Sequence, residues 1–274
     1  MALTLRVKIT MNFDIPIIQK HLATLEVGSA IRLFKEVTST NDALRELAKA
    51  GAPEGTVVIA DEQKAGDGRH GKPWFSPPGV NLYASVLFRP SIPPRDVAGF
   101  SFVVSLALSD AIKAEGLDST IKWPNDVLVD KKKVAGTLVE FATIDTRVDY
   151  VILGVGVNVN VTHDALRAAL GSAGHAAGSL RDAAGREIDR NRFAAAFLND
   201  LDRWVKTYTT QGPDPLLAAW RDREILTGRR VEIRGEGATY QGRVLGVDRE
   251  GHLLLRDPRG KRRRVLTGEV RLAD

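Results

Sequence analysis

The sequence predicts an α+β protein with a larger domain at residues 1–227 and a small all-β domain at residues 228–274. Up to residue 227, apolar stretches with helical periodicity are interspersed with short strand-like runs. After residue 229, short alternating runs are separated by Gly and Asp turns, which outlines a small barrel. The chain has 274 residues, 43% of them hydrophobic, which is enough for a core in both parts.

Charge divides the chain at the same place. The formal net charge is +5, and residues 228–274 contain twelve Lys or Arg against seven Asp or Glu. The remainder of the chain carries equal numbers of basic and acidic residues. The sequence therefore indicates a basic C-terminal module on a neutral body.

Element boundaries follow from periodicity and from Gly and Pro stops. Ser39 or Thr40 has the side chain of a helix N-cap, and Gly51 with Pro53 ends that helix. Residues 1–37 are weakly patterned, and Met11 is a second possible start. The expected helices lie at 14–24, 40–50, 96–115, 164–170, 190–210 and 214–226. The expected strands lie at 56–60, 81–88, 120–129, 133–143, 148–159, 230–234, 239–247, 252–256 and 262–267.

Composition excludes several classes of protein and site. The chain has no cysteine, so disulfides, thiolate catalysis and Cys-ligated zinc are excluded. Its five histidines lack metal-binding spacing, so we expect no dedicated transition-metal site. No apolar stretch approaches the roughly 20 residues of a membrane span, and no secretory pattern begins the chain. We therefore expect a cytoplasmic protein without a membrane partner.

The first motif is a long loop at residues 63–80 that contains four glycines and the basic residues Lys64, Arg69 and Lys72. Glycines at this spacing let backbone N–H groups converge on an anion, and Trp74 offers a stacking surface nearby. A loop of this length in a compact domain is usually functional. On glycine spacing alone, a flexible surface loop is an equally good alternative. The segment is not a Walker loop, because no Gly-Lys-Ser/Thr follows.

The second motif is Lys-Trp-Pro-Asn-Asp at 122–126, followed by three lysines at 131–133. A hairpin between 120–129 and 133–143 would bring Lys122 and Lys133 toward one ligand, and lysine suits phosphate as a point charge. Asp126 would suit a magnesium ion that bridges nucleotide oxygens. For Lys131 and Lys132 the favoured alternative is a solvated hairpin tip.

Two further motifs carry weaker signals. Hydroxyl and amide groups at residues 38–41 could hydrogen-bond a small polar ligand, although on these residues alone a plain helix cap is the favoured explanation. In the strand at 148–159, Gly154 and Gly156 lie on one face and permit close approach to the backbone. Asn158 needs a polar partner there, which either strand-end packing or a ligand would supply.

In their order and content, these motifs resemble those of biotin–protein ligases. The family's Gly-Arg-Gly-Arg-X-Gly-Arg-X-Trp loop is similar to residues 66–74, and its Lys-Trp-Pro-Asn-Asp motif is identical to residues 122–126. Its Lys-X-Ala-Gly and Gly-X-Gly-X-Asn motifs match residues 133–136 and 154–158. The resemblance covers about 36–160 by motif and reaches 274 by layout. Lipoate ligases share the catalytic fold but lack the loop and the Trp-Pro run.

The resemblance implies a fold and a reaction. The fold would be a mixed β-sheet catalytic domain with helices on one side, like that of class II aminoacyl-tRNA synthetases, followed by a small SH3-like β-barrel. The enzyme would use ATP, biotin and Mg²⁺ to form biotinyl-5′-AMP. It would then transfer biotin to a lysine of a biotin carboxyl carrier protein, as a biotin–[biotin carboxyl carrier protein] ligase.

The resemblance also implies site residues. Lys133 and Arg69 would be catalytic, and Asp126 would help to hold Mg²⁺. Biotin would be bound by Ser39, Thr40, Asn41, Gln63, Gly66, Arg69, Lys133, Gly136 and Gly154. ATP and the adenylate would be bound by Gly68, Arg69, His70, Gly71, Trp74, Lys122, Asn125, Asp126, Lys133 and Asn158.

One position departs from the family pattern. Position 67 is Asp where the family usually has Arg, and an acid in an anion-binding loop repels phosphate or carboxylate. Asp67 would either point outward and pair with Arg69 or Lys72, or weaken retention of the adenylate. Lys72 replaces another usual Arg and loses bidentate geometry. No role is therefore transferred to position 67.

Other interpretations remain open at this stage. A lipoate or octanoate ligase on the same fold is the nearest alternative. A nucleic-acid-binding protein is another, because the basic run at 259–264 would contact phosphates, although a solvated hairpin or a docking face for an acidic acceptor explains it too. About 35 residues precede the first motif, so we expect no N-terminal DNA-binding domain and no DNA partner. Edge strands would allow a homodimer.

Overall fold

The computed structural model describes residues 13–24, 26–235 and 237–273. The alternative start at Met11 lies outside these residues. Within them, a seven-stranded sheet has the order β1-β2-β3-β7-β6-β5-β4. β1 and β2 are parallel and the other neighbours are antiparallel, so the expected mixed sheet is confirmed. The strands are β1 (Ile31–Val37), β2 (Val57–Gln63), β3 (Leu82–Phe88), β4 (Thr120–Lys122), β5 (Asp126–Val129), β6 (Lys132–Ile144) and β7 (Arg147–Val157).

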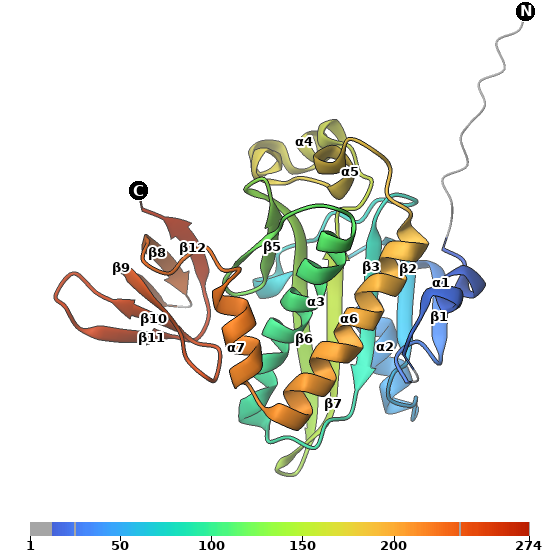
Figure 1. Cartoon of the computed structure of the whole chain (residues 1–274), viewed down its shortest axis with the longest axis horizontal. Helices are drawn as coiled ribbons and strands as arrows, with labels where there is room; N and C mark the ends of the chain where they lie inside the picture. Colours follow the sequence, from blue (N-terminus) through green and yellow to red (C-terminus); the bar gives the residue numbers. More distant parts are fainter. Residues whose placement is uncertain (1–12, 25, 236, 274) are drawn as a thin grey trace, which may run out of the picture.

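Helices cover both faces of this sheet, so the expectation of helices on one side only is wrong, because α2 packs on the face opposite α3 and α6 (Figure 1). The long helices α3 and α6 lie side by side across one face, whereas the short helix α2 packs on the other face against β2, β3 and β7. The helices are α1 (Ile15–His21), α2 (Thr40–Lys49), α3 (Phe100–Ala114), α4 (His163–Leu170), α5 (Leu180–Ala184), α6 (Arg190–Gln211) and α7 (Asp214–Arg221). Short 3-10 helices lie at Arg69–Gly71, Pro94–Gly99 and Gly171–Ala176.

Strand alternation sends side chains to two separate cores. On the α2 side, Val58, Leu87 and Ile152 pack with Leu44 of the helix. Their strand neighbours belong to the main core with α3 and α6. The period-2 side-chain alternation of a strand explains this division, because successive residues point to opposite faces. Helix α2 therefore sits with its N-terminus fixed over the sheet.

Helix α3 and the 3-10 helix before it form a long apolar stretch. Pro94–Ala114 is long and apolar enough to cross a membrane by length and composition alone, contrary to our expectation from the sequence. In the structure most of this stretch is buried inside the protein. Its apolar residues are explained by its contacts with α6, α7 and the sheet.

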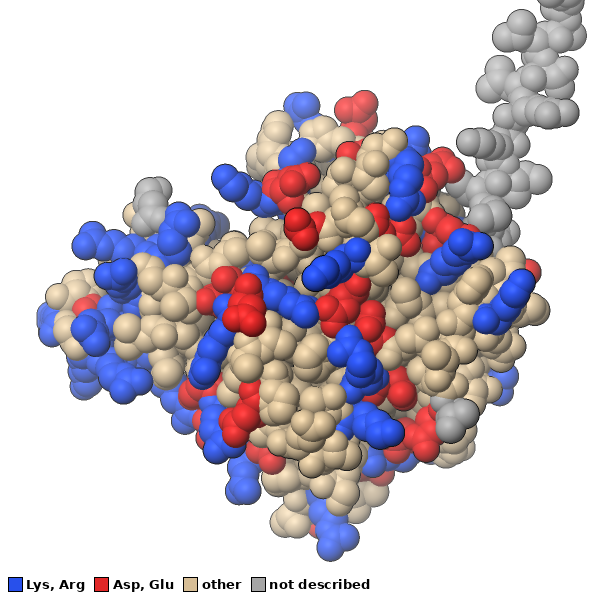
Figure 2. Space-filling view, viewed as in Figure 1, with Lys and Arg blue, Asp and Glu red and all other residues tan. Residues whose placement is uncertain are grey.

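The C-terminal residues form a separate five-stranded antiparallel sheet with the order β11-β10-β9-β8-β12. Its strands are β8 (Arg230–Gly235), β9 (Ala238–Val247), β10 (Leu253–Arg256), β11 (Arg262–Val265) and β12 (Glu269–Leu272). Apolar side chains such as Val231, Ile233 and Leu255 point inward and are buried. Figure 2 shows Lys and Arg side chains gathered on this domain, at the left of the view, while charges of both signs mix over the body.

Two strands were not expected from the sequence. β1 lies in the stretch predicted to be weakly patterned, because its charged residues obscure the alternation of Ile31, Leu33 and Val37. β12 follows the last expected strand. Both complete the edge of a sheet and depend on long-range pairing, β1 with β2 and β12 with β8.

Candidate active site

A cleft of about 500 Å³ opens where the sheet, the glycine loop and the C-terminal domain meet. Most of the predicted site residues line it, although they come from segments far apart in the sequence. These are Ser39, Thr40, Asn41, Gln63, Gly68, Arg69, Trp74, Lys122, Asn125, Asp126, Lys133, Gly136, Gly154 and Asn158. Gly66 and Gly71 are not among the lining residues, and the side chain of His70 lies outside the described part of the structure.

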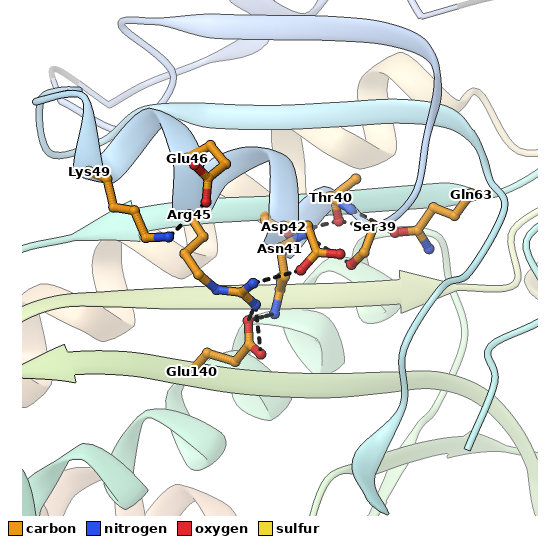
Figure 3. A network of polar contacts seen from close by, with 10 residues as sticks. Ser39, Thr40, Asn41, Asp42, Arg45, Glu46, Lys49, Gln63 and Glu140 are labelled. Carbon is orange, nitrogen blue, oxygen red and sulfur yellow. Dashed lines mark hydrogen bonds and ion pairs between the residues drawn. The ribbon is translucent and has the colours of Figure 1, made fainter. Parts of the chain in front are cut away.

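The start of α2 forms one end of the cleft (Figure 3). Ser39 is the N-cap, and its Oγ accepts a hydrogen bond from the backbone N–H of Asn41 at 3.3 Å. The backbone N–H of Thr40 donates to Gln63 Oε1 at 2.9 Å. Gln63 in turn donates from Nε2 to Ser76 Oγ, and Gly66 lies directly beside this amide. Hydroxyl and amide groups are therefore already aligned in a largely buried pocket.

Asn41 supports this arrangement through hydrogen bonds to the sheet (Figure 3). Its Oδ1 lies 2.6 Å from Ser85 Oγ, and its Nδ2 donates to Glu140 Oε2 at 2.9 Å. Ser85 Oγ also lies 2.8 Å from Thr40 Oγ1. The side chain of Asn41 is thus occupied by protein partners, which favours a supporting role, and its predicted contact with biotin stays a prediction.

Arg45, one turn further along α2, completes this network. Its guanidinium contacts both carboxylate oxygens of Glu140 on β6, at 3.1 and 2.9 Å, and Asp42 at 2.7 Å. Hydrogen bonding to Glu140 raises the pKa of Arg45 above its ordinary value. The pair links α2 to strand β6, next to the central strand β7, and so fixes the helix start relative to the sheet.

Three glycines on β6 and β7 make room for protein side chains. A Cβ at Gly154 would lie 2.2 Å from Asn41 Oδ1, and one at Gly156 would lie 2.4 Å from Trp74 Nε1. Gly136 faces Gly156 across the strand pair, and Trp74 packs over both. In this structure the space above Gly154 belongs to Asn41, so contacts of Gly136 and Gly154 with biotin stay predictions.

The β4–β5–β6 hairpins bring charges of both signs together. Lys133 Nζ lies 2.5 Å from Asp126 Oδ1 and 5.3 Å from the centroid of the Trp74 ring. Lys122 is the cross-strand partner of Asp126. The turn is tighter than expected, because Asp130 and Lys131 form it with positive φ and Lys132 already belongs to β6. Lys131 and Lys132 are exposed, as the solvated interpretation predicts, and Lys133 is half-buried.

Asn125 and Asn158 have structural partners. Asn125 donates from Nδ2 to the carbonyl of Thr137 at 2.6 Å, which ties the Trp-Pro turn to β6. Asn158 lies just after β7 rather than within a strand, is buried, and donates to the carbonyl of Gly178 at 3.0 Å. Strand-end packing therefore accounts for Asn158, and ligand contacts of both amides stay predictions.

The glycine loop is held closed at its base and by the C-terminal domain at its tip. Gly68 N–H donates to the carbonyl of Lys72 at 2.7 Å, and Trp74 N–H donates to that of Gly66 at 2.7 Å. Arg69 Nη2 donates to Thr267 Oγ1, and Lys72 Nζ lies 2.6 Å from Glu269 Oε2. Burial lowers the pKa of Arg69 below its ordinary value, although a guanidinium stays charged.

Asp67 is exposed at the edge of this loop. The expected pairing with Arg69 or Lys72 is not what the structure shows, because Thr267 and Glu269 take those two cations instead. The physical reason is the C-terminal domain, whose β11–β12 connection reaches the loop.

Two groups of cleft residues had no motif in the sequence: the apolar side chains Leu166, Leu170 and Ala177, and the segment 268–270.

One cluster of potential metal ligands lies elsewhere in the described residues. The ligand atoms of Asp248, Glu250 and His252, in the β9–β10 turn, lie within 4.8 Å of one another. Arg264 forms ion pairs with both carboxylates. A cation would have to displace that guanidinium, so this cluster is explained as an ion-pair network.

Comparison with known proteins agrees with the geometry. Residues 33–158 match the biotin/lipoate A/B protein ligase family, and residues 226–272 match the biotin protein ligase C terminal domain. The chain is 35% identical to the bifunctional ligase/repressor BirA of Bacillus subtilis over 240 residues, which cover 87% of this chain and 73% of that protein. It is 34% identical to the biotin–[acetyl-CoA-carboxylase] ligase of Paracoccus denitrificans, covering 84% and 95% of the two chains.

A solved structure extends the agreement to three dimensions. The biotin protein ligase of Aquifex aeolicus in complex with biotin and ATP superimposes with a TM-score of 0.74 at 27% identity, covering 89% of this chain and 98% of that one. The C-terminal domain match and the full-length relatives distinguish this chain from lipoate ligases. The motifs, the two-domain fold and these relatives together place the chain in the biotin protein ligase family.

Proposed function

We propose that the cleft is where this biotin protein ligase forms biotinyl-5′-AMP and passes biotin to a lysine of a carrier protein. The observation that carries the proposal is the meeting of all four sequence motifs in one cleft. Two buried polar atoms there, Trp74 Nε1 and Thr137 Oγ1, have no hydrogen-bond partner among the described residues. A polar ligand would satisfy them, since buried polar groups are normally paired.

Ser39, Thr40 and Gln63 would bind the ureido ring of biotin. Ser39 and Thr40 are buried and Gln63 is half-buried; their polar groups are aligned by the cap of α2 and supported by Ser85 and Asn41. A small ligand with both donors and acceptors suits such a set. The rigid support matters, because a preorganised pocket loses less entropy on binding.

The opposite end of the cleft would assemble two anions that repel each other. The carboxylate of biotin attacks the α-phosphorus of ATP, the bond to pyrophosphate breaks, and a mixed anhydride forms. Lys133 and Arg69 would stabilise the charge that develops on the carboxylate and phosphate oxygens. In the second step, the acceptor amine attacks the acyl carbon and AMP leaves, while the amine releases its proton.

Asp126 would help to hold Mg²⁺ with the nucleotide. Mg²⁺ is commonly held by one or two carboxylates together with substrate phosphates, and Asp126 supplies such a carboxylate in the cleft. Held there, Mg²⁺ would supply positive charge that neutralises part of the phosphate charge. Asp126 is paired with Lys133, so one lysine contact would be shared with the incoming phosphate.

Location and assembly are also proposals. The need for ATP agrees with the cytoplasmic location expected from the sequence.

For a homodimer, β1 is the candidate pairing edge, because β4 is bridged at Ile121 by Glu224 whereas β1 carries the exposed Phe34. Sedimentation would test this pairing by comparing the mass of the unmodified protein in solution with that of Phe34→Lys, which should be lower. Identical masses for the two would contradict pairing through β1.

Biotin-dependent exchange between ATP and labelled pyrophosphate tests the proposed function. We expect exchange with biotin and none with lipoate. Lys133→Ala should reduce it about 100-fold, the cost of removing one group that stabilises transition-state charge. Lys132→Ala, which changes an exposed neighbour on the same strand, is the matched control. Near-normal exchange in Lys133→Ala would remove the assignment of this residue.

A further inference from the structure

Four arginines form a row across the outer face of the C-terminal sheet. The strand register pairs Arg230 with Arg243, Arg243 with Arg256, and Arg256 with Arg262. All four side chains are exposed. With strands about 4.8 Å apart, the row extends about 14 Å from β8 to β11.

The positive charges of this row are not paired with acidic side chains within the described residues. Within the described residues, none of the four guanidinium groups forms an ion pair, and Arg243 Nε donates to the carbonyl of Gly228. Other arginines of the domain are neutralised, for example Arg263 by Asp257 and Arg264 by Asp248. Like charges placed directly opposite each other destabilise a sheet. An anionic partner over the row would offset this repulsion.

Chain length and strand register limit how far each end of the row lies from residues at the cleft. Arg262 is five residues before Thr267, which contacts Arg69, so chain length alone keeps their Cα atoms within about 18 Å. Arg230 lies four residues from Arg234, about 13 Å along β8, and Arg234 pairs in register with the cleft residue Glu269. A folded domain of about 100 residues has a radius of gyration of about 13 Å. A protein whose lysine enters the cleft would therefore reach the row.

We propose that the arginine row docks an acidic surface of the protein that presents the acceptor lysine. The inference rests on the proposed function, because it requires an acceptor at the cleft. A nucleic acid is less well matched: in the described part of β8–β11 the outer face has no aromatic side chain on which bases would stack. An acidic protein surface needs only the complementary charge.

The test reverses two charges of the row in the full-length enzyme. Arg256→Glu with Arg262→Glu should raise the KM for a purified biotin carboxyl carrier domain about tenfold, because rim charges mainly control association. Biotin-dependent ATP–pyrophosphate exchange should stay unchanged, because it involves no acceptor. Arg256→Gln with Arg262→Gln should give a smaller rise, and it serves as the milder variant if the reversed pair folds poorly.

Lys113→Glu with Lys206→Glu is the matched control. These exposed lysines lie on α3 and α6 and change the net charge equally. Equal acceptor KM values in the row variant and this control would overturn the inference, while loss of pyrophosphate exchange in the unmodified enzyme would instead overturn the proposed function. Unchanged acceptor KM combined with row-dependent binding of a labelled DNA duplex at about 0.15 M salt would overturn the inference as well and assign the row to nucleic acid.

Discussion

The two ends of the cleft are built in different ways. The α2 end is a continuous network with hydrogen bonds of 2.6 to 3.3 Å, most of them buried. It joins Ser39, Thr40, Asn41, Ser85 and Glu140. The glycine-loop end is held through exposed or half-buried side chains that reach a different domain: Arg69 to Thr267 and Lys72 to Glu269. The first arrangement is rigid before a ligand binds, whereas the second can exchange its partners for an anion.

Among changes that test the difference between the two ends, the largest effect should come from altering the rigid end at Gly154. Gly154→Ala adds a methyl group whose carbon would lie 2.2 Å from Asn41 Oδ1. Overpacking of this kind costs about 1–3 kcal/mol, and displacing Asn41 disturbs Thr40 and Ser85. We expect the KM for biotin in pyrophosphate exchange to rise more than about tenfold, since about 1.4 kcal/mol corresponds to a factor of ten.

A matched variant separates this effect from general instability. Gly185 has a φ of 65°, and no heavy atom lies within 4 Å of the position that a Cβ would take, so Gly185→Ala adds only backbone strain. It should lower the thermal midpoint while leaving the KM for biotin unchanged. Equal KM values for the two variants would show that Asn41 does not support the biotin end.

The next effect should come from Glu140→Ala, which removes the partner of both Asn41 and Arg45. A half-buried carboxylate in a network contributes about 1 kcal/mol, and its loss should raise the KM for biotin about fivefold with kcat nearly constant. Glu46→Ala is the control on helix α2, next to Arg45, because Glu46 pairs with the exposed Lys49 instead of joining this network. A fall in kcat without a change in KM would contradict the positioning role.

The same comparison explains how much could be predicted from the sequence. Ser39, Gln63, Lys133 and Asp126 stand in local motifs, and the structure brings them into one cleft as expected. Glu140 and Glu269 carry no local signal, because their roles depend on contacts with residues 99 and 197 positions away. The strand β1 was missed for a similar reason, since its pairing with β2 is long-range. The domain boundary at 227/228 and the ligand contacts of individual residues stay predictions.

A smaller effect is expected at the exchangeable end. Glu269→Gln removes the carboxylate that holds Lys72 and leaves the ammonium available for phosphate. An exposed ion pair is worth about 1 kcal/mol or less, so the KM for ATP should fall about threefold. Arg271→Gln, which alters the weaker neighbour of Glu269 at 3.6 Å, is the control. A rise in the KM for ATP would mean that Glu269 instead helps to close the loop.

The smallest effect concerns the pH dependence of stability. Hydrogen bonding to Lys72 lowers the pKa of Glu269 below its ordinary value of 4.5. Because the folded-state pKa is depressed, the pair stabilises the fold above pH 4.5 and loses this contribution as the pH falls through the folded-state pKa. The urea midpoints of the unmodified protein and of Glu269→Gln should therefore differ slightly well above pH 4.5 and approach each other as the pH falls below it. A difference that grows on acidification would show that the Lys72–Glu269 pair does not stabilise the folded protein. The contact of Arg69 with Thr267 would then be the main one that holds the loop.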